Sequence, residues 1–83
     1  MSLTGSLDLA SVPALMPRAD QLAASGRLDV SGVTAVDSAG VAFLLELQRR
    51  ARRQGKDLVI SGAGNRLRQL AVFFEVDSLL QLN

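Results

Sequence analysis

Val36-Asp37-Ser38-Ala39-Gly40-Val41 is the stretch that decides the fold, because a strand and a turn give way here to the strongest helical pattern in the chain. It places a carboxylate and a hydroxyl at a helix N-terminus, where up to four backbone N–H groups lack partners within the helix. Ser38 is either a cap or a site where an added phosphate would act strongly. Asp37 is the simpler N-cap. These two residues are the first candidates for function.

The helix that follows runs to about Gln54 and is amphipathic. Its buried face is centred on Leu44 and includes Gly40, Val41, Leu47, Gln48 and Ala51. The opposite face carries Ala42, Glu46, Arg49 and Arg53, with Ser38 near its edge. Phe43 falls on a flank, beside Arg50 and Gln54.

Two interpretations of this outer surface stay open. The simpler one is a solvated face on which Glu46 and Arg50 form a pair worth a few tenths of a kcal/mol. The alternative is a docking surface for another protein, since arginine and aromatic residues dominate such contacts. Its candidate residues are Ala42, Phe43, Glu46, Arg49, Arg50 and Arg53. Phe73 either extends this surface or packs in the core beside a core-facing Phe74.

The composition excludes several classes of function. The 83 residues are expected to form one domain, residues 1–83, with 48% apolar residues to build its core. There is no cysteine and no histidine, so thiolate chemistry and the usual proton shuttle at neutral pH are absent. We therefore expect no enzymatic activity. A net charge of +1, with only three aromatic residues, argues against a nucleic-acid binder.

Strand and helix patterns alternate along the chain. The expected strands cover residues 3–9, 27–33 and 57–61. The expected helices cover residues 11–25, 38–54, 65–74 and 77–80, and the first of them begins or bends near Pro17. Such alternation predicts an α/β sheet in which neighbouring strands are parallel and joined by right-handed crossovers.

Three motifs carry a resemblance to a known family. They are Gly5-x-Leu7, the strand Leu28-Asp29-Val30-Ser31-Gly32, and the Val36–Val41 turn with its amphipathic helix. Together they resemble the STAS domain family over nearly the whole chain. The Asp-Ser-x-Gly turn alone is a weak pattern. Combined with the strand before it and the later helix Leu67-Arg68-x-Leu70-Ala71, it becomes fairly specific.

The resemblance implies a small mixed sheet with helices packed mainly on one face, acting as a binding and regulatory module. In the anti-sigma-factor antagonists of this family, a kinase phosphorylates the serine directly after the aspartate, which blocks partner binding. That serine is Ser38 here. In the small STAS subunits of the Mla phospholipid transport system, the corresponding region docks on the ATPase of an ABC transporter and supports its activity.

The segments Leu44-Leu45-Glu46-Leu47 and Val76-Asp77-Ser78-Leu79-Leu80 look more like the Mla-type subunits. We therefore expect an ABC transporter ATPase as the partner, with an anti-sigma factor kinase as the alternative. Family members usually have another strand before the one that holds Gly5 and Leu7. Only Met1 and Ser2 precede it here, so we expect that strand to be missing, the sheet edge to be open and a homodimer through that edge.

Other motifs rank lower. Gly62-Ala63-Gly64 begins like a dinucleotide-binding loop, but Leu67 stands where the third glycine belongs. Asp29 and Asp37 could meet at neighbouring strand ends, yet two carboxylates without a third ligand make a poor metal site. We therefore expect no cofactor and no metal. The longest apolar runs are five residues, and the N-terminus lacks the pattern of a signal peptide. We expect a cytoplasmic protein, held at the inner membrane only through its partner.

Overall fold

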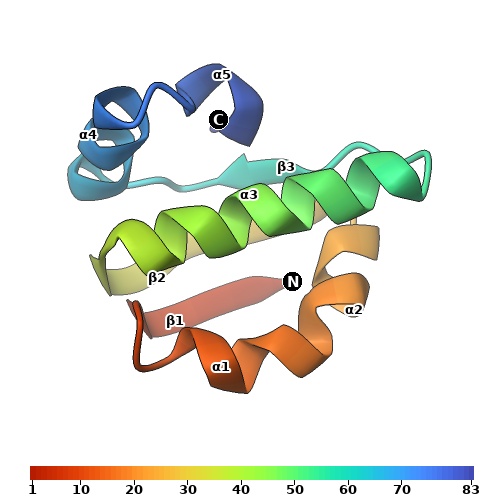
Figure 1. The fold of residues 1–83 in the computed structure, drawn as a ribbon, viewed down its shortest axis with the longest axis horizontal. Coiled ribbons are helices and arrows are strands. Elements are labelled where there is room, and N and C mark those ends of the chain that lie inside the picture. The colour runs from red at the N-terminus through yellow and green to blue at the C-terminus, as the bar shows by residue number, and fades with distance from the viewer.

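A computed structural model describes all residues, 1–83. The strands are β1 (Ser2–Leu7), β2 (Arg27–Val36) and β3 (Val59–Ser61). The helices are α1 (Val12–Leu15), α2 (Ala19–Ala24), α3 (Ser38–Arg53), α4 (Asn65–Phe73) and α5 (Asp77–Leu80), with a 3₁₀ turn, Met16–Arg18, between α1 and α2 (Figure 1). None of these helices is both long and apolar enough to cross a membrane.

The three strands form one sheet in the order β1-β2-β3, and both pairings are parallel. Each strand is separated from the next by at least one helix, and this crossover brings the chain back to start the following strand in the same direction. The predicted α/β class and STAS-like fold are confirmed. The sheet is parallel throughout, however, and the mixed sheet that we expected is not observed.

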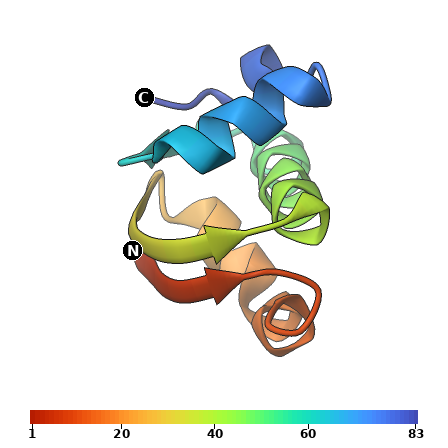
Figure 2. The ribbon, with the colours of Figure 1, turned by 90° about the vertical axis from the view of Figure 1, so that its left-hand side faces the viewer.

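The helices lie mainly on one face of the sheet, as predicted. Figure 2 shows α1, α2 and α3 on the same side of the strands, with α4 and α5 towards the β3 end. Side chains alternate accordingly: Leu3, Leu28 and Ile60 are buried in the core, whereas Thr4 and Ser31 are exposed. The central helix, α3, supplies the largest share of the core with Val41, Phe43, Leu44, Leu47 and Ala51.

Some element boundaries differ from the predicted ones. The first helix bends as expected, because Pro17 lies in the 3₁₀ turn that separates α1 from α2. β2 continues to Val36 rather than ending at Val33, since its second half pairs with β1. α3 ends at Arg53, and Gly55 follows with a φ of +69°, a conformation that glycine adopts without strain.

Gln48 is the one buried polar side chain and joins three elements. Its Nε2 group donates hydrogen bonds to the carbonyl oxygens of Leu58, at 2.8 Å, and of Leu80, at 2.7 Å. Leu58 directly precedes β3 and Leu80 ends α5, so one amide ties the C-terminal part of the chain to α3. The sequence pattern placed Gln48 on the buried face but did not indicate this role.

Replacing Gln48 by leucine is expected to lower the free energy of unfolding by about 2 kcal/mol, because two buried carbonyl groups lose their donor. Urea denaturation followed by circular dichroism measures the change. Gln54→Leu is the matched control, since Gln54 is exposed at the end of α3. Equal stability of the two variants would contradict the structural role of Gln48.

The two edges of the sheet are not alike. Beyond β3, Leu82 forms a parallel bridge with Ile60, and the backbone N–H of Asn83 donates to the Ile60 carbonyl at 2.8 Å. β1 forms the other edge and pairs only with β2. A dimer through the β1 edge stays a prediction, which light scattering over a concentration series would test.

Candidate functional site

Asp37 is the N-cap of α3, as predicted. Its backbone is extended, and its Oδ1 accepts a hydrogen bond from the Gly40 N–H at 3.1 Å. Its other oxygen, Oδ2, accepts from the Leu9 N–H at 3.1 Å, so one carboxylate joins the loop after β1 to the start of α3. These N–H groups, that of Leu9 above all, hold the pKa of Asp37 below its usual value.

Gly40 lets α3 begin close against the end of β1. A Cβ atom at this position would collide with the carbonyl oxygen of Leu7 and would lie 2.9 Å from Cγ2 of Val36. The Asp-Ser-x-Gly turn therefore has two structural requirements. The aspartate satisfies the first N–H groups of the helix, and the glycine gives the backbones room to pack.

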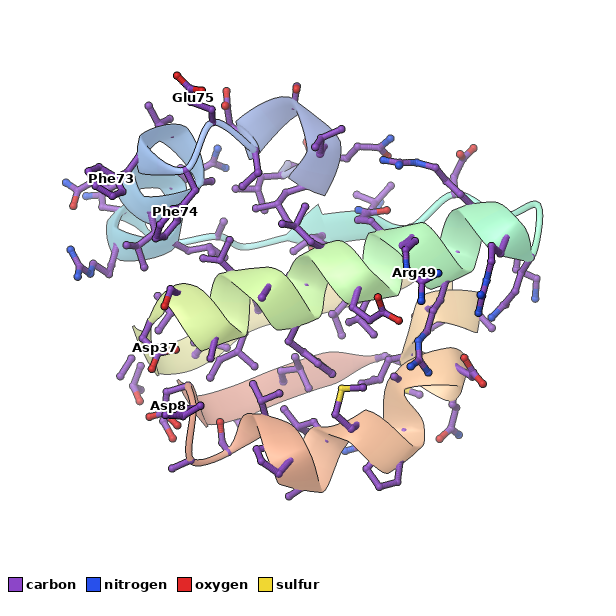
Figure 3. The ribbon with its side chains drawn as sticks, viewed as in Figure 1. Asp8, Asp37, Arg49, Phe73, Phe74 and Glu75 are labelled. Atoms are coloured by element: carbon purple, nitrogen blue, oxygen red, sulfur yellow. The ribbon has the colours of Figure 1, made fainter.

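Ser38 has no structural role in the fold. It is the first residue of α3, it is exposed, and its hydroxyl group forms no hydrogen bond within the protein. Of the two roles predicted for Ser38, that of helix cap is excluded, because Asp37 is the cap. Asp8 and Asp37 lie at this same end of α3 (Figure 3), and Asp8 accepts hydrogen bonds from the N–H groups of Ala10 and Ser11.

One side of α3 faces away from the sheet and carries a row of residues that we call the outer stripe. Its members are spaced by three or four residues: Ser38, Ala42, Leu45, Arg49 and Arg52. A groove of about 230 Å³ runs beside its N-terminal half, lined by Ser38, Val41, Ala42, Leu45 and Phe74. The outer stripe is thus small and apolar over its first half and basic over its second.

The structure corrects the prediction that Phe43 is an anchor of the docking surface. Phe43 is only 2% exposed and belongs to the core. α2 packs along this flank of α3, as the bond between Arg50 Nη1 and Asp20 Oδ1 at 3.0 Å shows. A helical wheel places Phe43 on a flank, but the pattern within one helix cannot tell that a second helix covers it.

Of the two C-terminal phenylalanines, Phe74 is placed differently from the prediction, and Phe73 takes the exposed one of its two predicted positions. Phe74 was predicted to face the core, yet it is 43% exposed, and Phe73 is 77% exposed. Their rings meet edge to face at a centroid distance of 5.1 Å. α4 ends at Phe73 and Glu75 has a φ of +60°, so the helical period no longer sets the direction of Phe74. Phe74 therefore borders the outer stripe.

The charged candidates form a network at the middle of α3. Glu46 accepts hydrogen bonds from Nε of Arg49 and Nε of Arg50, both at 2.8 Å, so the predicted Glu46–Arg50 pair is confirmed. Arg50 is half-buried and also binds Asp20, which ties α3 to α2. Arg49 and Arg53 are exposed, and Arg53 forms no ion pair.

The two arginines lower the pKa of Glu46 to about 2, first through the hydrogen bond from Arg49 and then through that from Arg50. A lowered pKa in the folded state means stability that is present above the ordinary value of 4.5 and lost as the pH falls towards 2. We expect the stability difference between the wild type and Glu46→Gln to shrink over this range. Urea denaturation of both proteins at pH 7, 4.5 and 2.5 measures it. A difference that stays constant would contradict the network.

The lower-ranked sites are not assembled. Asp29 lies near the start of β2 and Asp37 follows its end, so the two carboxylates are at opposite ends of the strand. Asp29 instead accepts a hydrogen bond from the Ser31 N–H at 2.8 Å. No group of three or more metal-ligating side chains is found in the structure.

Sequence reasoning missed three members of the site, Leu45, Arg52 and Phe74. The signal for Leu45 was present, because positions 38, 42, 45, 49 and 52 repeat at helical spacing. Phe74 could not be found in this way, since it lies just beyond the last regular turn of α4.

Comparison with known families agrees with this fold. A family model described as Mlab, STAS domain, matches residues 1–81. The chain belongs to the STAS domain family. No curated protein matches the sequence. Membership of the STAS family suggests an interaction or regulatory role, and the resemblance stated above on the Asp-Ser-x-Gly turn is thereby confirmed at the level of the family.

Proposed function

We propose that this STAS domain is a non-catalytic subunit that docks on the ATPase of an ABC phospholipid transporter of the Mla type and supports its assembly and activity. One observation carries the proposal: the outer stripe and its groove are exposed and sit beside Ser38, whose hydroxyl is unused within the fold. The family description, which names Mlab, supports this choice of partner.

The side chains of the site support binding rather than chemistry. Both carboxylate oxygens of Asp37 accept backbone N–H groups, and Glu46 is held by two arginines. Their lowered pKa values keep both carboxylates ionised at neutral pH, which suits a fixed surface and not a proton donor. The surface residues proposed for docking are Ser38, Ala42, Leu45, Glu46, Arg49, Arg52, Arg53 and Phe74.

The partner can be identified by co-purification. The tagged protein is isolated from native extract, the bound polypeptide is identified by mass spectrometry, and binding is repeated with the two purified proteins. We expect an ABC transporter ATPase whose ATP hydrolysis rises when the STAS domain is added. Recovery of a different partner, or an ATPase whose activity is unaffected, would contradict the proposal.

The exposure of Ser38 also favours a second candidate function, that of an anti-sigma-factor antagonist switched by phosphorylation. Phosphate would add about −1.5 to −2 charges next to Asp37, at a surface that otherwise docks. Ser38→Asp should weaken binding to the partner in both cases and leave the circular dichroism spectrum unchanged. Phosphorylation of Ser38 by a co-purified serine kinase would favour the second candidate over the first.

A further inference from the structure

We infer that the outer stripe receives a partner helix that is apolar at one end and acidic at the other, with its acidic end over the C-terminal turns of α3. This inference rests on the proposed docking function. It adds the chemistry of the segment that docks and its direction along α3.

The apolar end of the partner helix is assigned by the groove beside Ala42. Ala42 is exposed and small, Leu45 is half-exposed, and Phe74 forms the opposite wall. An apolar side chain of the partner that enters this groove loses contact with water on several sides and covers the Phe74 ring. Shallow apolar grooves of this kind, bordered by an aromatic residue, become desolvated when a partner covers them, and desolvated contacts contribute most to binding.

The acidic end is assigned by the basic half of the outer stripe. Residues 49–56 contain five basic side chains: Arg49, Arg50, Arg52, Arg53 and Lys56. The carboxylates near them are Glu46, Asp20 and Asp57, so positive charge is in surplus. Arg52 and Arg53 have no carboxylate within ion-pair distance. Acidic side chains on the partner would therefore be attracted to this end.

The direction of the partner helix along α3 follows because the N-terminal end of α3 is negatively charged. Asp8 and Asp37 lie there together (Figure 3), and the first basic side chain of the sequence is Arg18. An acidic segment placed over Ser38 would face both carboxylates. Two exposed arginines of α4, Arg66 and Arg68, line other grooves that share no residue with the groove beside Ala42.

A helix fits the outer stripe because its members recur at every turn of α3. One turn rises about 5.4 Å, and rows of side chains with this spacing interlock with those of a second helix. Leu45 and Arg52 are seven residues apart, which is about 10 Å along the axis. The partner helix should thus present its apolar and acidic residues about two turns apart. Basic clusters of about this size also attract anionic lipid, so binding to vesicles is measured as well.

The test compares two double variants with the same change in net charge. Arg52→Glu/Arg53→Glu reverses the charge of Arg52, the last member of the outer stripe, and of its exposed neighbour Arg53, and Arg66→Glu/Arg68→Glu is the control on α4. Binding to the purified ATPase is measured at two salt concentrations. We expect the first variant to lose about tenfold or more in affinity, and the control to lose less than about threefold. The affinity of the first variant should also depend less on salt than that of the wild type.

Photo-crosslinking groups at positions 45 and 53 give the direction independently. We expect both to label one helix of the ATPase, with the label from position 53 next to acidic residues. Equal losses in both double variants, or labels on separate segments, would overturn the inference while leaving the docking function standing. Labels on a second copy of this chain, or retention on phosphatidylglycerol vesicles without the ATPase, would also overturn it. Failure of the wild type to bind the ATPase at all would refute the docking function itself.

Discussion

Gly40→Ala is expected to lower the free energy of unfolding by about 3 kcal/mol, the upper end of what overpacking usually costs. The new methyl group would meet the carbonyl oxygen of Leu7, and this oxygen belongs to the backbone at the end of β1. Backbone cannot move aside as a flexible side chain can, so α3 must shift away from the sheet. A domain of this size has a total stability of about 4 to 12 kcal/mol, so the loss is a large part of it.

Gly64→Ala is the matched control for this experiment. Gly64 precedes α4 with a φ of −79°, and a Cβ there would have no neighbour within 4 Å. We expect its stability to stay within about 1 kcal/mol of the wild type, the usual range for a glycine-to-alanine change at a helix start. Urea denaturation of the three proteins measures both effects. A stable Gly40→Ala protein would show that α3 does not need this close approach.

Ala42→Arg is expected to weaken binding to the ATPase at least about 100-fold and to leave the fold intact. Ala42 lies in the middle of the outer stripe and lines the groove beside Phe74, so a long charged side chain would fill the place of the partner. The side chain is exposed, and arginine is nearly as good a helix former as alanine. The stability should therefore change by less than about 0.5 kcal/mol.

Ala14→Arg provides the comparison, because Ala14 is an exposed alanine of α1, away from the outer stripe. Calorimetric titration with the purified ATPase should give wild-type affinity for this variant. If both alanine variants bind equally well, the docking surface lies elsewhere on the domain. If Ala42→Arg unfolds, its thermal transition will reveal this before binding is interpreted.

Much of the fold was predictable because local signals agreed with one another. Asp37 followed by Gly40 marked the start of α3, and Gly55 marked its end. Pro17 marked the bend between α1 and α2. The alternation of strands and helices then indicated parallel pairing. What the local signals could not supply was the length of β2, which depends on its pairing with β1.

The candidate site was less predictable because surface exposure is decided by neighbouring elements. Phe43 and Leu45 are both apolar residues on α3, and the packing of neighbouring elements on one flank distinguishes the buried one from the half-exposed one. Phe74 follows a regular helix but lies in the turn after it. The exposure of Arg49 and Arg53 was predicted correctly, since charged residues at helical spacing rarely face a core.

The bridge between Leu82 and Ile60 has a consequence for how this domain can self-associate. The carbonyl group of Ile60, in the middle of β3, is already occupied there, so β1 is the edge strand that has no partner on its outer side. In two molecules joined through their β1 strands, the β3 side of each sheet, which carries the Leu82 bridge, would face outward. Such pairing uses the one edge strand without a partner on its outer side, which favours a pair over a continuous fibre.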